Sequence, residues 1–286
     1  PARFRLSARI ATPEPSMQAT TIALDREGPV AVLTLNRPDK ANAMDWAMWQ
    51  ELRRAMQWAD AEPTVRAVIL RGEGANFTAG IDLELLGSVR QEIADACDGR
   101  MREKLRRLIL DLQDSLTSIE RCRKPVLAAI HGHCIGGGVD LVCACDMRYC
   151  SSDATFSIKE IDVGMTADVG TLQRLPKLIG EGMVRELAYT GRAVAGQEAK
   201  EIGLVNHSYA SAGMLFHEVA KIAATIAKKS PLSIRGIKEM VNYARDHSVA
   251  DGLNYIATWN AAMLMSEDLT EAMTAARAKR EPKFRD

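Results

Sequence analysis

Hydrophobic and polar positions follow a β-type pattern at the start of the chain and a helical pattern soon after it. Residues 20–25 and 30–35 are two β-rich runs around a Gly-Pro turn, which predicts a β-hairpin. Residues 45–59 then carry an apolar stripe with helical spacing, which predicts a helix packed on the core. The stripe consists of Trp46, Trp49, Leu52 and Met56.

Strand and helix patterns keep alternating through the first two-thirds of the chain. Further strands are predicted at 65–70, in the apolar run after Pro125, and at 147–149 and 155–158. A helix is predicted at 100–121, whereas residues 84–98 are weakly patterned and are expected to be mobile. Recurring β-β-α and β-α units indicate an α/β fold.

Beyond residue 205 the pattern becomes helical. Helices are predicted at about 211–229, 231–245, 249–265 and 267–279. We expect this apolar tail to pack on another subunit, although a tail folded back on its own core is the alternative. Its large apolar residues include Met240, Trp259, Met263, Leu264, Met265 and Met273. The predicted organisation is a leader at 1–16, an α/β core at 17–206 and a helical region at 207–286.

The composition is that of an ordinary globular protein, with 286 residues, 47% of them hydrophobic, and a formal net charge of zero. No charge run indicates a nucleic acid or a membrane surface as partner, and no apolar stretch is long enough to span a bilayer. The six cysteines are interpreted as buried thiols in a reducing compartment. We predict no metal site. Residues 1–16 are interpreted as a disordered leader or a cloning-derived extension and are excluded from the fold argument.

A glycine-dense turn, Gly136-Gly137-Gly138, lies between the apolar run after Pro125 and a second apolar stretch that predicts a buried helix. Glycine is costly in entropy unless the backbone requires it. One interpretation is that bare amides at a helix N-terminus stabilise a developing oxyanion, with Asp140 bordering the same cavity. The other is a tight strand-to-helix turn in which Asp140 complements the helix dipole.

Several separate motifs, in the right order, resemble the enoyl-CoA hydratase/isomerase (crotonase) family from about residue 20 onward. They include residues 31–38, Phe77-Thr-Ala-Gly-Ile-Asp82 and 131–138. Within the family, residues 134–140, 159–164 and 167–174 are most similar to dienoyl-CoA isomerases. Those enzymes convert 3,5-dienoyl-CoA into 2,4-dienoyl-CoA during oxidation of certain unsaturated fatty acids. The resemblance implies a spiral of β-β-α units with a helical C-terminal region that builds homotrimers, often paired as homohexamers.

The resemblance also implies a binding site for an acyl-CoA thioester. The amides of Ala79 and Gly137 would bind the thioester oxygen. Residues expected to contact the substrate are Ala41, Gly80, Ile81, Asp82, Leu83 and Gly138. No cofactor is expected, since coenzyme A is part of the substrate. The expected location is the cytoplasm, or the mitochondrial or peroxisomal matrix if the source is eukaryotic.

Three carboxylates match family positions: Asp140, Glu160 and Asp168. From the sequence alone Asp168 would be interpreted as a helix N-cap. The resemblance instead favours a catalytic role, because hydratases of the family usually carry a small residue there. By analogy Glu160 is the base at the α-carbon and Asp168 the acid at the distal carbon, or the reverse. Asp140 would be a supporting carboxylate.

Two alternatives remain open from the sequence. One is an enoyl-CoA hydratase or another acyl-CoA isomerase, although hydratases usually present glutamates at the positions of both Asp140 and Glu160. The shorter Asp140 side chain disfavours the water position that hydration needs. The other is a non-catalytic relative that binds RNA, which the absence of a basic cluster disfavours.

Overall fold

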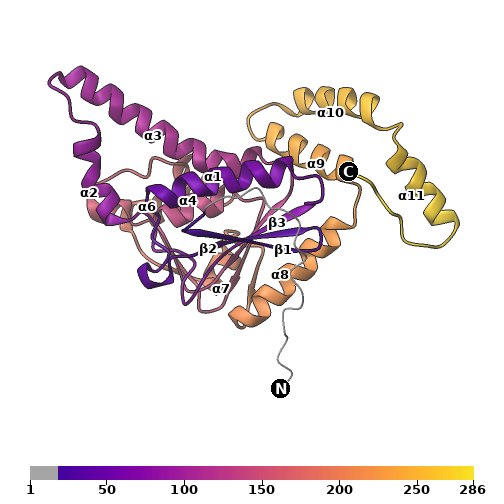
Figure 1. Ribbon diagram of the computed structural model, residues 1–286, viewed down its shortest axis with the longest axis horizontal. Helices are drawn as coiled ribbons and strands as arrows, with labels where there is room; N and C mark the ends of the chain where they lie inside the picture. Colours follow the sequence, from indigo (N-terminus) through magenta and orange to yellow (C-terminus); the bar gives the residue numbers. More distant parts are fainter. Residues whose placement is uncertain (1–18) are drawn as a thin grey trace.

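The predicted α/β fold is confirmed by the computed structural model, which describes residues 19–286 (Figure 1). The predicted leader at 1–16 lies outside the described residues. The main sheet has the strand order β1-β2-β3-β4-β6-β9, with β1 and β2 antiparallel and the other pairs parallel. Its strands are β1 (Ile22–Glu27), β2 (Val30–Leu35), β3 (Ala67–Gly72), β4 (Val126–Ile130), β6 (Met147–Ser151) and β9 (His207–Tyr209).

A second, three-stranded sheet stands beside the first. It consists of β5 (His133–Ile135), β7 (Thr155–Ser157) and β8 (Val194–Ala195). The chain crosses from β4 to β5 at Gly132, whose φ is 55° and where a Cβ would lie 2.1 Å from the Ala75 carbonyl oxygen. The stretch after Pro125 therefore contributes β4 to the main sheet and β5 to the second sheet.

Helices follow the strands and cover both faces of the main sheet. The α-helices are α1 (Trp46–Ala61), α2 (Leu83–Glu92), α3 (Asp98–Arg121), α4 (Gly137–Cys143), α5 (Thr171–Arg174), α6 (Glu181–Thr190), α7 (Gly196–Glu201), α8 (Ala212–Ala227), α9 (Pro231–Ala244), α10 (Val249–Met263) and α11 (Glu267–Arg277). Short 3-10 turns are η1 (Pro38–Lys40), η2 (Glu160–Val163) and η3 (Leu175–Lys177).

The two faces of the sheet are both apolar, as in parallel sheets buried on both sides. On β3, Val68 and Leu70 belong to the large core cluster shared with α1 and α3, whereas Ala67 and Ile69 face a second cluster. Helix α8 completes that second cluster, and Figure 1 shows it on the opposite side of the sheet from α1 and α3. These layers fix the strand ends that carry the site.

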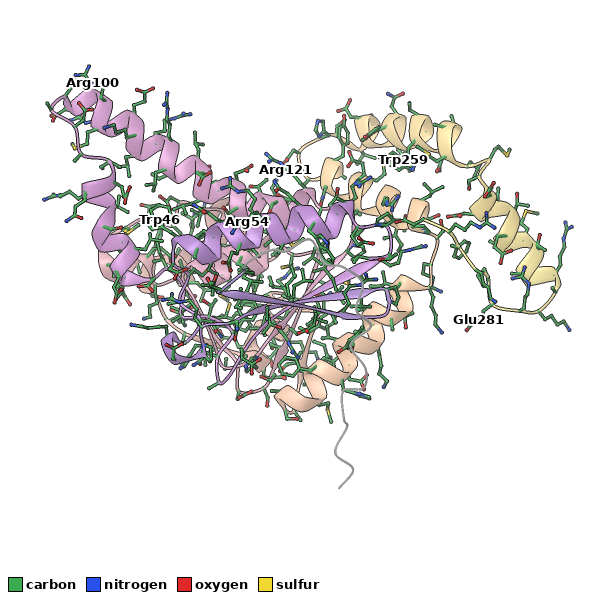
Figure 2. The ribbon with its side chains drawn as sticks, in the orientation of Figure 1. Trp46, Arg54, Arg100, Arg121, Trp259 and Glu281 are labelled. Atoms are coloured by element: carbon green, nitrogen blue, oxygen red, sulfur yellow. The ribbon has the colours of Figure 1, made fainter. Side chains whose placement is uncertain are left out.

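Two segments project from this body on opposite sides. Figure 2 places Arg100 at the outer end of α3 and Trp259 on the arm formed by α9 to α11. Helix α2 occupies part of the weakly patterned interval 84–98, and within it only Leu85 is buried, which explains the weak pattern. Within residues 19–286, no helix combines the length and apolarity needed to cross a membrane.

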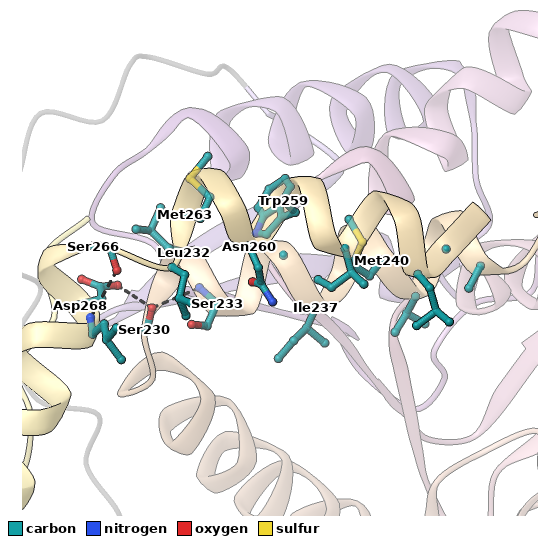
Figure 3. Close-up of a pocket in the computed structure, with 18 of the residues that line it drawn as sticks. Ser230, Leu232, Ser233, Ile237, Met240, Trp259, Asn260, Met263, Ser266 and Asp268 are labelled. Carbon is teal, nitrogen blue, oxygen red and sulfur yellow. Dashed lines mark hydrogen bonds between the residues drawn. The ribbon is translucent and has the colours of Figure 1, made fainter. Parts of the chain in front are cut away.

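The C-terminal arm is attached to the body through α9. Lys238 is buried, and its Nζ donates to Asp146 Oδ2 at 2.8 Å and to the carbonyl oxygens of Ile119 and Lys124. Helix α10, by contrast, has no buried residue among its fifteen. An apolar groove of about 700 Å³ lies between α9, α10 and the start of α11 (Figure 3).

Candidate active site

Two backbone segments meet at the glycine-dense turn between β5 and α4. Thr78 forms a bridge with Cys134, and the turn starts at Gly136, whose φ is 51°. A Cβ at Gly138 would lie 2.5 Å from Thr78 Cγ2, and a Cβ at Gly80 would lie 2.5 Å from the Ile135 carbonyl oxygen. Glycine is therefore required at both positions for the segments to approach.

In the segment 77–82, the structure gives the amide of Ala79, the expected oxyanion donor, an acceptor of its own. The Ala79 N–H donates to the Ala41 carbonyl oxygen at 2.9 Å, and the Gly80 N–H donates to Thr78 Oγ1 at 3.1 Å. Within residues 19–286, the amides of Ile81 and Gly137 have no hydrogen-bond acceptor. A Cβ at Gly137 would lie 3.6 Å from the Ile81 nitrogen, so these two free donors are neighbours.

The loop that binds the Ala79 amide is held in an unusual conformation. Ala41 and Asn42 both adopt left-handed backbone angles, with φ of 48° and 55°. The fully buried Asn42 side chain accepts from the Arg37 N–H at 2.8 Å and donates to the carbonyl oxygens of Glu73 and Asn76, both at 2.8 Å. Left-handed alanine is strained and persists only where its surroundings determine it. Ala41 is thus rigidly placed where its carbonyl oxygen accepts the Ala79 amide.

Asp82 and Leu83, which we expected to contact substrate, differ in their surroundings. The Asp82 carboxylate caps α2 by accepting the Glu84 N–H at 2.9 Å and forms an ion pair with Arg37 at 2.8 Å. Both oxygens are therefore engaged in holding the loop. Leu83 is 71% exposed and has an open apolar surface.

Asp140 lies in the first turn of α4 and is fully buried. Its Oδ1 accepts the Thr171 N–H at 2.5 Å, while Oδ2 has no partner within the described part of the chain. Burial raises the pKa of this carboxyl to about 6, against the opposing effect of the Thr171 hydrogen bonds. Asp140 thus caps α5 from a different helix.

Glu160 starts η2, three residues after Ser157, the last residue of the strand β7. Its Oε1 lies 3.0 Å from where a Cβ at Gly136 would stand, so the carboxylate borders the glycine turn. Its Oε2 is buried and has no partner among residues 19–286. Burial raises the pKa of Glu160 to about 7, and the charge of Asp140 adds to this effect. A carboxyl with this pKa exchanges its proton readily at neutral pH.

Asp168 is half-buried in the segment before α5, and it is not the N-cap of that helix. Gly170 occupies the N-cap position. Gln113 of α3 donates to the Asp168 carbonyl oxygen at 2.6 Å and so holds this segment from outside. Burial raises the pKa of the Asp168 carboxyl. The N-cap interpretation from the sequence was therefore wrong.

The segment that carries Asp168 is also fixed by a buried ion pair. Arg174 pairs with Glu120 of α3 at 3.1 Å, and both side chains are less than 20% exposed. The guanidinium passes under Gly170, where a Cβ would lie 1.9 Å from Nη1. Gly170 has a φ of 140°, so only glycine fits there.

The fold brings the three carboxylates close enough for their charges to shift one another's pKa values. The charges of Asp140 and Asp168 both raise the pKa of Glu160, and the charge of Asp168 raises that of Asp140. Beside them lie two unpaired main-chain donors in a largely buried site. Such an arrangement can stabilise an oxyanion and move protons to and from neighbouring carbons. The sequence did not reveal Thr171 or Gln113 as parts of this site, and it predicted Ile81 as a substrate contact without indicating its free amide.

Comparison with known proteins shows which family the chain resembles. The family model described as enoyl-CoA hydratase/isomerase matches residues 25–286. The chain is 49% identical over 253 residues to the "Delta(3,5)-Delta(2,4)-dienoyl-CoA isomerase, peroxisomal" of Arabidopsis thaliana, covering 88% of this chain and 91% of that protein. It is 46% identical to the mitochondrial protein of the same name from Mus musculus, covering 87% of this chain and 76% of that one.

Solved structures show the same fold. The enoyl-CoA hydratase from Bacillus anthracis superposes with a TM-score of 0.84 at 31% identity, covering 93% of this chain and 99% of that chain. A putative enoyl-CoA hydratase from Streptomyces coelicolor A3(2) gives a TM-score of 0.85 at 27% identity, covering 99% of both chains. The spiral fold and the helical C-terminal region that the resemblance implied are thereby confirmed.

Proposed function

Because this chain belongs to the enoyl-CoA hydratase/isomerase family, whose enzymes act on acyl-CoA thioesters, we propose that it is an isomerase converting 3,5-dienoyl-CoA into 2,4-dienoyl-CoA. The observation that carries this proposal is the presence of two partly buried carboxyls with raised pKa values, Glu160 and Asp168, of which Asp168 is close enough for its charge to raise the pKa of Glu160. Relatives named for this reaction are 42–49% identical to the chain.

The oxyanion hole of this proposal consists of the Ile81 and Gly137 amides. In each turnover the thioester oxygen gains negative charge when the α-proton leaves. Two fixed N–H donors stabilise that charge, and the loss of one such donor costs roughly 3 kcal/mol of transition-state stabilisation. Gly137 also starts α4, so the helix dipole adds to its effect.

Two carboxyls then carry out the double-bond shift. Glu160 takes the proton from C2, and the freed electron pair forms the C2–C3 double bond. The former C3–C4 π pair forms the C4–C5 double bond, and the C5–C6 π pair takes a proton at C6 from Asp168. Glu160 ends protonated and Asp168 ionised, and proton exchange with water restores the start. Asp140 keeps a negative charge beside Glu160 and anchors the segment of Asp168 through Thr171.

Hydration is the second candidate reaction, because the solved structures with the same fold are named as hydratases. It needs a water molecule held between two carboxylates. Asp140 is fully buried and one of its oxygens is bonded to the Thr171 amide, so only its other oxygen is free for a water. This engagement favours isomerisation. The proposed proton transfers need neither an RNA ligand nor a cofactor, because coenzyme A is part of the substrate.

The test compares 3,5-dienoyl-CoA with 2-enoyl-CoA as substrates of the wild type and of Asp168→Asn. We expect isomerisation by the wild type, and a loss of 10²- to 10⁴-fold in kcat for the variant. Asp162→Asn is the matched control, since Asp162 is a half-exposed carboxylate paired with Lys159. Wild-type turnover by Asp168→Asn, or faster hydration than isomerisation, would contradict the proposal.

A homotrimer or homohexamer is the assembly that we propose. The support is the apolar groove along α9 and α10, in which Ile237, Met240 and Met263 are labelled in Figure 3, together with exposed Val249 and Leu253. Leu253→Asp is expected to shift the sedimentation coefficient toward that of the monomer. A wild type that itself has the sedimentation coefficient of a monomer would contradict the proposed assembly.

The compartment of the proposed reaction follows the source of the protein. We propose the cytoplasm, or the peroxisomal or mitochondrial matrix if the source is eukaryotic, since the names of the relatives give those two organelles.

A further inference from the structure

A polar cavity of about 390 Å³ lies beside the segment that carries Asp168. Val169 and Gly170, the two residues after Asp168, form one of its walls, and charged side chains of α3, α5 and the end of α9 form the others. Val169 is the only aliphatic residue among the described residues that line it. On this side the segment is therefore held by polar contacts and not by close packing.

Arg174 of α5 supplies several of these contacts. Its Nη1 donates to the Val169 carbonyl oxygen at 3.4 Å, and its Nη2 donates to Thr117 Oγ1 of α3 at 3.1 Å. Its Nε and Nη2 also donate to Glu120 Oε2, at 3.3 and 3.1 Å. Because Val169 directly follows Asp168, the position of this guanidinium helps to determine where the main chain places the Asp168 side chain.

Glu120 is shared between two arginines. Its Oε2 binds Arg174, and its Oε1 forms an ion pair with Arg245 Nη2. Burial alone would raise the pKa of Glu120, but the charges of Arg174 and Arg245 lower it, so the carboxylate is ionised at neutral pH. The Glu120 and Arg174 side chains are 18% and 14% exposed, and that of Arg245 is 31% exposed. The three side chains form one partly buried ionic network.

Arg245 belongs to the C-terminal arm, where it directly follows α9 as its C-cap. Figure 2 shows Arg121, the last residue of α3, next to this arm. The end of α9 makes a second contact, because Lys177 Nζ of η3 donates to the Arg245 carbonyl oxygen at 3.1 Å. The arm is therefore bonded both to the helix before the Asp168 segment and to the turn after it.

We propose that Arg245 is a positioning residue for Asp168, acting through Glu120 and Arg174, so that the seating of the C-terminal arm on the body controls the proton transfer at C6. Without Arg245, Glu120 and Arg174 can shift, and the adjacent cavity leaves room for residues 169–170 to move. This inference rests on the proposed role of Asp168 as the acid.

Arg245→Gln tests the inference in the full-length protein. We expect kcat with 3,5-dienoyl-CoA to fall about tenfold with little change in KM, because a small displacement of a reacting group slows the step that uses it. Arg245→Lys keeps a positive charge beside Glu120 and should recover kcat to within about threefold of the wild type. Arg53→Gln is the matched control, since Arg53 is 22% exposed and links α3 to α1 through Asp111 and Asp114.

A partial reaction separates positioning from general damage. In deuterium oxide, exchange of the C2 protons of octanoyl-CoA requires Glu160 and the main-chain amides but not Asp168. Arg245→Gln should exchange these protons at a rate within about twofold of the wild type, while its isomerisation is slowed. Equal losses in exchange and isomerisation would overturn the inference. Glu120→Gln breaks the same network and decides the matter if Arg245→Gln fails to fold by circular dichroism.

Amide hydrogen exchange measured without substrate tests the contact itself. Residues 164–172 should lose protection in Arg245→Gln and keep it in Arg53→Gln. Unchanged protection of this segment, or an unaltered kcat, would overturn the inference. Failure of the proposed isomerase activity would look different, because the wild type would then not convert 3,5-dienoyl-CoA while the loss of protection in Arg245→Gln would still be seen.

Discussion

Asp140→Asn isolates the electrostatic role of the buried carboxylate that touches neither free amide. Asparagine keeps the shape, and its Oδ1 can still accept the Thr171 N–H that Asp140 accepts at 2.5 Å. The substitution therefore removes a charge and leaves the α5 cap in place. The charge matters because it is the second cause of the raised pKa of Glu160, after burial. Its removal must lower that pKa.

The structure sets the size of this effect. Glu160 has a pKa of about 7, against an ordinary value of 4.5. Burial is the largest cause of the increase, so we expect the variant to move the pKa of Glu160 part of the way back to its ordinary value. At pH 7 the pKa of about 6 leaves Asp140 mostly ionised in the wild type, and about half of Glu160 is ionised there. The variant should ionise more of Glu160 at that pH and, relative to its own plateau, should be up to about twofold faster than the wild type.

The assay measures kcat/KM with 3,5-dienoyl-CoA between pH 5 and 9, from the absorbance gained when the diene conjugates with the thioester carbonyl. The acid limb should move down in Asp140→Asn and stay in place in Asp162→Asn, whose side chain is far more exposed. An acid limb that does not move would refute the assignment of Glu160 as the base. Movement of the basic limb instead would assign Glu160 as the acid.

Three further substitutions test the site and its supports. Glu160→Gln should raise the free energy of unfolding by roughly 2 kcal/mol at pH 8 and by much less at pH 5, because the buried carboxyl destabilises the fold when it ionises as the pH rises through about 7. The same difference in urea midpoint between variant and wild type at both pH values would contradict this. Gln113→Leu removes the donor to the Asp168 carbonyl oxygen and should lower kcat about tenfold with little change in KM, so an unaltered kcat would show that Asp168 is held otherwise. Lys238→Met leaves Asp146 buried without its cation and should cost about 3–5 kcal/mol in urea unfolding, whereas the double variant with Asp146→Asn should recover much of that loss.

The pattern of hydrophobic positions predicted those helices and strands whose own residues determine their structure. The helix beginning after Asp45 has a strong apolar stripe and an N-cap that accepts the Met48 N–H, and it was predicted to within two residues. The three-residue strand β5 was not predicted, because its partners β7 and Thr78 lie far away in sequence. Helix α2 was missed since it buries only Leu85. Short or shallow elements depend on contacts that periodicity does not record.

The site shows the same division. Asp140 was predicted beside the cavity from the glycine-dense turn, and Glu160 and Asp168 were identified through a family resemblance. The fold places the three carboxylates close enough for their charges to shift one another's pKa values. The expected donor Ala79 already bonds to the Ala41 carbonyl oxygen, whereas the Ile81 amide has no acceptor among residues 19–286. The direction of an N–H follows from main-chain angles, and these depend on the left-handed Ala41 and on Gly80, whose φ is 90°. No side-chain pattern reports that direction.

The proposed use of the main-chain donors at Ile81 and Gly137 has an evolutionary consequence. A point mutation cannot delete an amide, except to proline, so the side chain at 81 is free to drift among residues that keep the local path. Selection acts instead on residues that fix the local path of the main chain. Gly80 and Gly138 are such positions, since any Cβ there would lie 2.5 Å from a neighbouring segment. A saturation library should therefore tolerate many residues at 81 and almost none at 80 or 138.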